Sequence, residues 1–151
     1  MLIGIISDTH GLLRPEALDA LRGSKHIIHA GDVGAPEILD RLRQLAPVTA
    51  VRGNIDHDAW AEQLPETEVV ELAGATVYVL HNLKQLDLDA RVARFAAVIS
   101  GHTHQPKIET RSGALYFNPG SAGPRRFRLP ISIGRLRIGN GSIAPELITI
   151  A

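Results

Sequence analysis

The sequence predicts an α/β protein with two β-sheets, each covered by helices, and three features of the chain lead to this prediction. The first half alternates between apolar runs of strand length and segments with apolar residues at helical spacing, which is typical of parallel strands joined by right-handed crossovers. The second half contains strand-like runs that flank short glycine-containing turns, as in β-hairpins. The chain has 151 residues, a length that fits one domain, so we expect a single domain over residues 1–151.

In the first half, three strands alternate with two helices. Each helix is expected to begin at a Pro-Glu pair, because proline and an early acidic residue favour the first helical turn. Leucine and isoleucine residues then recur at helical spacing. The expected strands are residues 2–7, 25–29 and 48–51, and the expected helices begin at Pro15 and Pro36.

In the second half, three hairpins, one helix and one further strand are expected. The turns Ala73-Gly74, Ser112-Gly113 and Gly139-Asn140-Gly141 each separate two runs of strand length. The hairpin strands are residues 68–72 with 75–80, 107–111 with 115–118, and 131–138 with 143–150. The helix is expected over 88–96 and the remaining strand over 97–100.

The composition excludes several kinds of site. The chain contains no cysteine, so disulfides and thiolate metal ligands are both excluded. Sixteen basic residues balance sixteen acidic ones, and aromatic residues make up only 4%. We therefore expect no nucleic-acid partner, because the chain supplies neither a general attraction to phosphate nor stacking platforms. The apolar run at the N-terminus is too short for a signal peptide or a membrane span, so we expect a cytoplasmic protein with no membrane partner.

Side chains that can bind metals follow the ends of the expected strands. They are Asp8 and His10 after 2–7, Asp32 after 25–29, Asn54 and Asp56 after 48–51, His81 after 75–80, and His102 and His104 after 97–100. In open α/β sheets, ligands collect where the loops at the carboxyl ends of the strands converge. One pocket would therefore receive all of these groups.

This mixture of carboxylate, imidazole and amide donors suits two divalent ions of Mn, Fe, Zn, Co or Ni better than Ca or Mg. Asp32 is the natural bridge between the ions, because it lies in the tight Gly31-Asp32 loop. Each motif alone also has an ordinary explanation: Asp8 could cap a helix, and Gly-Asp and Gly-Asn pairs are common in turns. Five such motifs at five strand ends favour the metal site.

The ordered motifs resemble those of the calcineurin-like metallophosphoesterase superfamily, whose pattern is D-x-H, G-D, G-N, H and G-H-x-H. The matching residues are Asp8-Thr9-His10, Gly31-Asp32, Gly53-Asn54, His81 and Gly101-His102-Thr103-His104. The resemblance covers nearly the whole chain. Asn118-Pro119-Gly120-Ser121 also resembles the NPGS signature of the compact bacterial and archaeal phosphodiesterase branch.

The resemblance implies a four-layer α/β/β/α sandwich of two mixed sheets with a dinuclear metal centre at one edge. It assigns one ion to Asp8, His10, Asp32 and His104, and the other to Asp32, Asn54, His81 and His102. Mn is the expected metal, with Ni, Fe, Zn and Co as alternatives. Asp32, Asn54 and His102 would carry catalysis, and Asn54 would also contact the substrate.

The resemblance further implies a metal-dependent phosphoesterase, and we expect a phosphodiesterase that acts on a small phosphate ester. A hydroxide shared by the two ions would attack phosphorus in line with the leaving oxygen. One alternative is a phosphomonoesterase. Another is a non-catalytic scaffold or binding module, because a eukaryotic scaffold subunit of the retromer coat resembles the same branch. A scaffold has no need of seven intact ligands, so the full set favours an enzyme.

Two positions depart from the wider superfamily pattern. Many members have a histidine directly after the asparagine, where it contacts phosphate or protonates the leaving group, and Gly-His after the metal-binding histidine. Here Ile55 and Asn82 follow Asn54 and His81. We therefore expect weaker activity on esters with poor leaving groups.

Several other polar residues have two interpretations. Asp56 would orient a metal ligand or lie in a solvated loop, and His29 is expected to have a structural role inside an apolar strand. Arg125, together with Arg126 and Arg128, would bind substrate phosphate or lie in a solvated loop. Exposed strand edges in the second half would allow two copies of the chain to pair, so a homo-oligomer is an open alternative.

Overall fold

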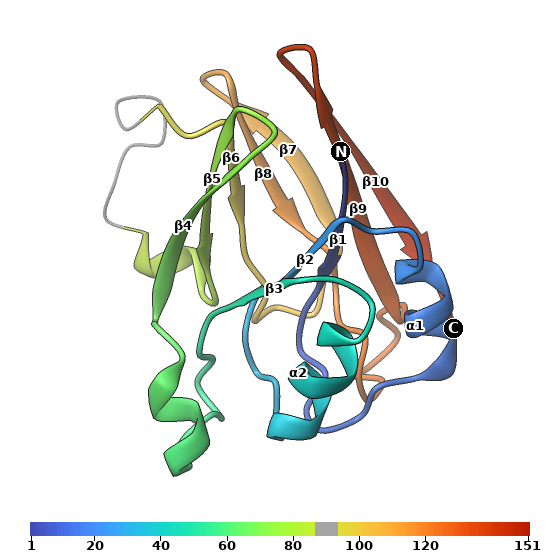
Figure 1. The fold of residues 1–151 in the computed structure, drawn as a ribbon. Coiled ribbons are helices and arrows are strands. Elements are labelled where there is room, and N and C mark those ends of the chain that lie inside the picture. Colours follow the sequence, from blue (N-terminus) through green and yellow to red (C-terminus); the bar gives the residue numbers. More distant parts are fainter. Residues whose placement is uncertain (87–93) are drawn as a thin grey trace.

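The computed structural model describes residues 1–86 and 94–151, which form two five-stranded sheets (Figure 1). The first sheet has the order β10-β9-β1-β2-β3, with bounds Ser142–Thr149, Ser132–Gly139, Leu2–Ile6, His26–His29 and Val48–Ala50. The second sheet has the order β4-β5-β6-β8-β7, with bounds Thr67–Leu72, Ala75–Leu80, Ala97–Ile99, Ala114–Asn118 and Lys107–Arg111.

Both sheets are mixed, as predicted. β1, β2 and β3 pair in parallel, and so do β5, β6 and β8. The three hairpins β4–β5, β7–β8 and β9–β10 are antiparallel, and β9 also pairs with β1. The hairpins therefore add antiparallel strands to two short parallel sheets. Because a short turn joins the two strands of a hairpin, a chain of this length can form two sheets.

The two α-helices of the described residues are short and begin where proline predicts them. α1 spans Pro15–Leu21 and α2 spans Pro36–Arg43, each with its proline in the first turn and a glutamate directly after it. Two 3₁₀ helices, η1 (Ala59–Gln63) and η2 (Leu83–Gln85), were not expected from the sequence. The predicted helix 88–96 lies mainly outside the described residues, and residues 94–96 are not helical. In the part of the chain that the structure describes, no helix is both long and apolar enough to cross a bilayer.

Three apolar clusters of the described residues hold the layers together. The largest lies between the two sheets and includes Ile5, Val79 and Phe117. A second joins α1 and α2 to the outer face of the first sheet, and a smaller third cluster covers the outer face of the second sheet. The third contains Tyr78, whose ring stacks on Phe95 with 5.0 Å between centroids. Burial of these apolar surfaces is the main term that stabilises the fold.

The two ends of the sandwich differ. The turns of the three hairpins lie together at the upper end in Figure 1, where Gly74, Gly113 and Gly141 line one hollow. The carboxyl ends of β1, β2 and β3 point to the opposite end, beside α2. The loops that carry the predicted metal ligands therefore belong to this lower end.

Phe117 gives a test of the core between the sheets. Its side chain is fully buried, and a Cβ at Gly134 would lie only 2.5 Å from its Cζ atom, so this glycine leaves room for the ring. We expect Phe117→Ala to lower the free energy of unfolding by about 3–5 kcal/mol, because it leaves a large cavity. Denaturant unfolding would measure the change.

Phe127→Ala is the matched control, because Phe127 is 88% exposed. It should change the free energy of unfolding by no more than about 0.5 kcal/mol. A loss below about 1 kcal/mol for Phe117→Ala would contradict the assignment of this ring to the core.

Candidate metal centre

Five loops bring all seven predicted metal ligands together at the lower end of the sandwich. The loops follow β1, β2, β3, β5 and β6, so both sheets contribute. Asp8, Asp32, His81 and His104 are buried, His10 and His102 are partly exposed, and Asn54 is exposed. The site therefore has a buried carboxylate–imidazole interior and an amide at its surface.

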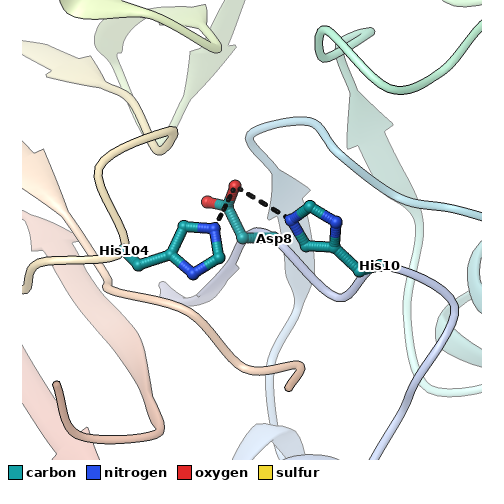
Figure 2. Close-up of side chains that lie close together, drawn as sticks. All are labelled: Asp8, His10 and His104. Atoms are coloured by element: carbon teal, nitrogen blue, oxygen red, sulfur yellow. Dashed lines mark ion pairs between the residues drawn. The ribbon is translucent and has the colours of Figure 1, made fainter. Parts of the chain in front are cut away.

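Asp8 lies between His10 and His104 (Figure 2). Its Oδ1 atom lies 3.4 Å from His104 Nε2 and 3.8 Å from His10 Nε2, and the two rings approach the carboxylate from opposite sides. Its Oδ2 atom accepts hydrogen bonds from Ser7 Oγ at 2.7 Å and from the His102 backbone N–H at 3.1 Å. One carboxylate oxygen is thus fixed by the protein, and the other faces the imidazoles.

Asp32 and His81 form the neighbouring part of the cluster. His81 Nε2 lies 3.3 Å from Asp32 Oδ2 and 3.9 Å from Asp8 Oδ1. His81 Nδ1 donates to the carbonyl oxygen of Ala30 at 2.8 Å. A carbonyl only accepts, so Nδ1 carries the proton and Nε2 is the nitrogen available to a metal, which is the usual arrangement of a metal-binding histidine.

Asn54 closes the cluster on its exposed side. Its side-chain amide lies 3.0 Å from His81 Nε2 and 3.3 Å from His102 Nδ1. With the amide rotated by half a turn, its nitrogen donates to both oxygens of Asp32 at 3.2 Å. Both orientations place Asn54 between Asp32 and the two imidazoles.

The donor set fits divalent ions. Two groups of side chains present ligand atoms within 4.8 Å of one another: Asp8, His10 and His104, and Asp8, Asp32 and His81. Asp8 Oδ1 and His10 Nε2 are buried without hydrogen-bond partners. Unpaired buried polar atoms are costly, and a cation would satisfy both. Asp8 belongs to both groups, so the assignment of the bridge to Asp32 stays a prediction.

The charges of the cluster favour a cation. Burial by itself would raise the pKa of the Asp8 carboxyl, but interactions with His10 and His104 outweigh it and hold this pKa well below its usual range. Burial likewise opposes ionisation of Asp32, yet its interactions with His81 lower the pKa of the Asp32 carboxyl. Burial would lower the pKa of His81, but the two carboxylates raise it. Both carboxylates are therefore ionised, and a metal ion competes with a proton at His81.

The backbone of these loops is strained. Five of the seven predicted ligands have positive φ angles: Asp8, His10, Asp32, His102 and His104. This region is unfavourable for residues other than glycine and is enriched at functional sites. Gly53 and Gly101 allow the loops to approach each other, because a Cβ at Gly53 would overlap the Asp32 carboxylate and one at Gly101 would overlap Ser7 Oγ.

Asp56 orients two ligand loops. It is buried, and its carboxylate accepts backbone hydrogen bonds from Val33 at 3.1 Å, Gly34 at 3.0 Å and Gly53 at 2.9 Å. It therefore ties the loop of Asp32 to the loop of Asn54. Of the two interpretations that the sequence left open, the structure supports the orienting role.

The Asn118–Ser121 segment connects two ligand loops, those after β1 and β6, a role that sequence reasoning missed. The Asn118 side chain donates to Gly101 O at 2.9 Å and to Thr103 Oγ1 at 3.1 Å. Ser121 Oγ donates to Asp8 O at 3.0 Å. The segment begins at the last residue of β8, so its position at a strand end, like that of the ligands, was the available signal.

His29 has the expected structural role. It is fully buried, and its Nδ1 accepts from Gly31 N–H at 3.1 Å. Nε2 therefore carries the proton and donates to Thr9 Oγ1 at 3.0 Å, which in turn donates to Val33 O at 2.8 Å. This chain supports the loops of both Asp8 and Asp32.

A cleft of about 620 Å³ opens beside the cluster. Asn54, His81 and His102 line its inner end, and Asn82 lines it too. Arg125 does not line it: the side chain is exposed, and its guanidinium donates to Leu129 O at 3.2 Å. The substrate-binding role of Arg125 stays a prediction.

The fold and this cluster define the class of protein, a two-sheet α/β protein with a histidine–aspartate metal centre at the loop end. Residues 1–141 match the model of the calcineurin-like phosphoesterase superfamily domain, and the chain belongs to this superfamily. It is 38% identical, over 98% of its own length and 92% of the relative's, to a protein of Methanothermobacter thermautotrophicus that is named a probable metallophosphoesterase.

Solved structures share the fold. A novel archaeal phosphodiesterase has a TM-score of 0.81 at 24% identity, covering 98% of this chain and 100% of that one. Wild-type Vps29 of Entamoeba histolytica, complexed with Zn²⁺, has a TM-score of 0.78 at 24% identity, covering 100% of both chains. At these identities the likeness concerns the fold alone.

Asp56→Asn tests the orienting role of this carboxylate. The substitution keeps the size of the side chain. It replaces the carboxylate that accepts the backbone hydrogen bonds by an amide group. We expect the affinity for Mn²⁺ to fall about 10–100-fold, as for other outer partners of metal ligands, with little change in the circular dichroism spectrum. Calorimetric titration would measure the affinity.

Asp58→Asn is the control, because Asp58 is an exposed acid two residues away. It should leave the affinity for Mn²⁺ within about twofold of the wild type. Equal affinities for Asp56→Asn and the wild type would show that the loops keep their ligand geometry without this carboxylate.

Burial of His29 predicts a pH dependence of stability in the metal-free protein. Burial lowers the pKa of His29 to about 4, against 6.5 for a solvated histidine. Below pH 6.5 the unfolded chain gains a proton that the folded protein takes up only near pH 4, so stability falls as the pH decreases through this window. The loss amounts to about 3 kcal/mol.

Denaturant unfolding of wild type and His29→Asn between pH 7 and 4, in the presence of a chelator, would isolate this contribution. Asparagine keeps an acceptor near Gly31 N–H but does not titrate. Its unfolding free energy should therefore fall less steeply than that of the wild type, and parallel curves would contradict the assignment.

Proposed function

We propose that the protein is a metal-dependent phosphodiesterase that binds two divalent ions. The observation that carries the proposal is the pair of overlapping ligand groups, which share Asp8 and open through Asn54, His81 and His102 into a cleft. Membership of the phosphoesterase superfamily supports the reaction class. The archaeal phosphodiesterase with the same fold supports a diester as substrate.

The residues would divide between two ions, one of them held by Asp8, His10, Asp32 and His104 and the other by Asp32, Asn54, His81 and His102. Mn²⁺ is the metal we expect, with Ni, Fe, Zn and Co as alternatives. When bound, such ions supply Lewis acidity toward phosphoryl oxygens and lower the pKa of water.

The chain's own residues supply position and charge. Asn54 and His102 line the cleft, so they would contact oxygens of the phosphate held there. Asp56 and Asn118 hold the loops of these two residues rigidly, which keeps the donors in place before the substrate arrives. Ile55 carries no proton donor, so esters with good leaving groups would react best.

A diester is favoured over a monoester by the shape of the site. The cleft extends beyond the ligands to Thr67, Tyr78 and Gln85, and a second ester group would occupy this extension. A monoester would leave it empty. Phosphomonoesterase activity remains the alternative within the enzyme class.

A scaffold is the second candidate function. It is favoured by Ile55 and Asn82, which replace residues common in the superfamily, and by the fold shared with Vps29. Against it stand the buried polar atoms of Asp8 and His10, which lack hydrogen-bond partners. A protein with no use for metal ions would gain stability by replacing them.

Hydrolysis of bis(p-nitrophenyl) phosphate tests the proposal. Metal would be removed, and Mn²⁺, Ni²⁺, Zn²⁺ or Mg²⁺ added back singly. We expect turnover that depends on metal and is greatest with Mn²⁺, and we expect p-nitrophenyl phosphate to react more slowly. Asp32→Ala and His102→Ala should each lower kcat/KM by at least about 100-fold, the upper range for outer partners of metal ligands.

Matched controls are Asp40→Ala and His57→Ala, which remove exposed side chains of the same kinds and should leave kcat/KM within about twofold of the wild type. If two ions bind per chain but no ester is hydrolysed with any metal, the scaffold becomes the better description.

A further inference from the structure

Arg52 is the one lysine or arginine among the described residues that line the cleft. Among the described residues that line the cleft, the charged ones are Arg52 and Glu66, and the others are histidines, amides, hydroxyls and apolar groups. A cation beside a metal-bound phosphate would attract negative charge on the substrate. The position of Arg52 relative to the metal ligands determines which part of the substrate it contacts.

The backbone at Arg52 is fixed relative to the metal ligands. Its N–H donates to Pro65 O at 2.8 Å, and the next two residues are Gly53 and Asn54. Gly53 N–H is held by Asp56, and Ile55 N–H donates to Asp32 Oδ1 at 3.1 Å. Arg52 therefore stands at a defined place beside the cluster, although its side chain is not part of it.

The ion pair that Arg52 forms in the structure is weak, so a stronger anionic ligand would replace its partner. Arg52 Nη2 lies 3.1 Å from Glu66 Oε1, with side chains 31% and 80% exposed. An ion pair with one partner as exposed as Glu66 contributes little to stability, typically no more than about 1 kcal/mol. This is the single ion pair of Arg52 in the described chain, and a guanidinium has five donors. A carboxylate or phosphate bound by two parallel hydrogen bonds would displace Glu66.

We infer that Arg52 binds an anionic group in the second ester substituent of the substrate, with Glu66 as a competing internal anion. The preferred substrate class would be a phosphodiester that carries a carboxylate or a further phosphate beyond the scissile group. This inference rests on the proposed phosphodiesterase function and adds the specificity. Asn82 and Gln85 in the same cleft supply polar neighbours for such a group.

Two matched substrates test the inference: p-nitrophenyl phosphodiesters of 4-hydroxybutanoate and of 4-hydroxybutanamide. They differ in one charge at nearly equal size. We expect kcat/KM of the Mn²⁺-loaded wild type to be about tenfold higher for the carboxylate. Arg52→Gln should bring this ratio to about one, and Arg52→Lys should leave it in between. Glu66→Gln should raise it severalfold.

The reaction with bis(p-nitrophenyl) phosphate keeps the two proposals apart, because its second group is neutral. Arg52→Gln and Glu66→Gln should change that rate by no more than about threefold. The exposed pair of Arg43 and Asp40 provides the control Arg43→Gln, which should leave every ratio unchanged.

Two results would overturn the inference. An equal fall of kcat/KM for all three esters in Arg52→Gln would place Arg52 at the scissile phosphate or in the support of the loop. A wild-type ratio near one would remove the charge preference. If bis(p-nitrophenyl) phosphate is not hydrolysed, the proposed function fails instead, and calorimetric binding of the two matched esters decides the preference of Arg52 without turnover.

Discussion

The carboxylate of Asp8 is fully buried, and an ionised group in that position is tolerated only with partners that offset its charge. Those partners come from the two sheets. Ser7, beside it on the loop after β1, fixes one oxygen together with the His102 backbone from the loop after β6. The imidazoles of His10 and His104 face the other oxygen. The packing of one sheet on the other is therefore coupled to the geometry of the metal centre, because neither sheet alone satisfies this charge.

The same coupling explains how the strained loops persist. Left-handed backbone at residues such as Asp8 and His102 costs free energy locally. The cost is offset by the large apolar cluster between the sheets and by hydrogen bonds that join the loops. Asp56 supplies those bonds between the loops after β2 and β3, and Asn118 supplies them at the loop after β6. The ligand loops are thus tied to one another by hydrogen bonds, and such preorganisation is what catalysis by fixed charges requires.

The hairpins, the helix starts and the polar residues at strand ends could be predicted because each depends on a local pattern. Pro15 and Pro36 begin helices, glycine-containing turns separate hairpin strands, and the polar residues follow strand ends. The supporting contacts could not be predicted in this way. The bond from Ser121 to Asp8 joins residues 113 positions apart, and nothing in the sequence near either residue specifies it. The identity of the buried acid was equally hidden, since Asp56 and Asp58 differ in burial and hardly in sequence context.

The residues that line the cleft for the substrate could likewise not all be predicted from local sequence patterns. The sequence predicted a substrate-binding role for Arg125 because this residue follows the NPGS segment and lies beside other arginines. Both features are visible in the sequence. Among the described residues, the cleft contains Arg52 instead, an arginine that directly precedes the Gly53-Asn54 motif. One loop then carries the predicted metal ligand Asn54, the apolar Ile55 and the positive charge of Arg52. The side chains of such a loop offer no proton to the leaving group, so the site would hydrolyse esters with good leaving groups best. The cation would bind the other ester substituent, so the substrate would be recognised through that group.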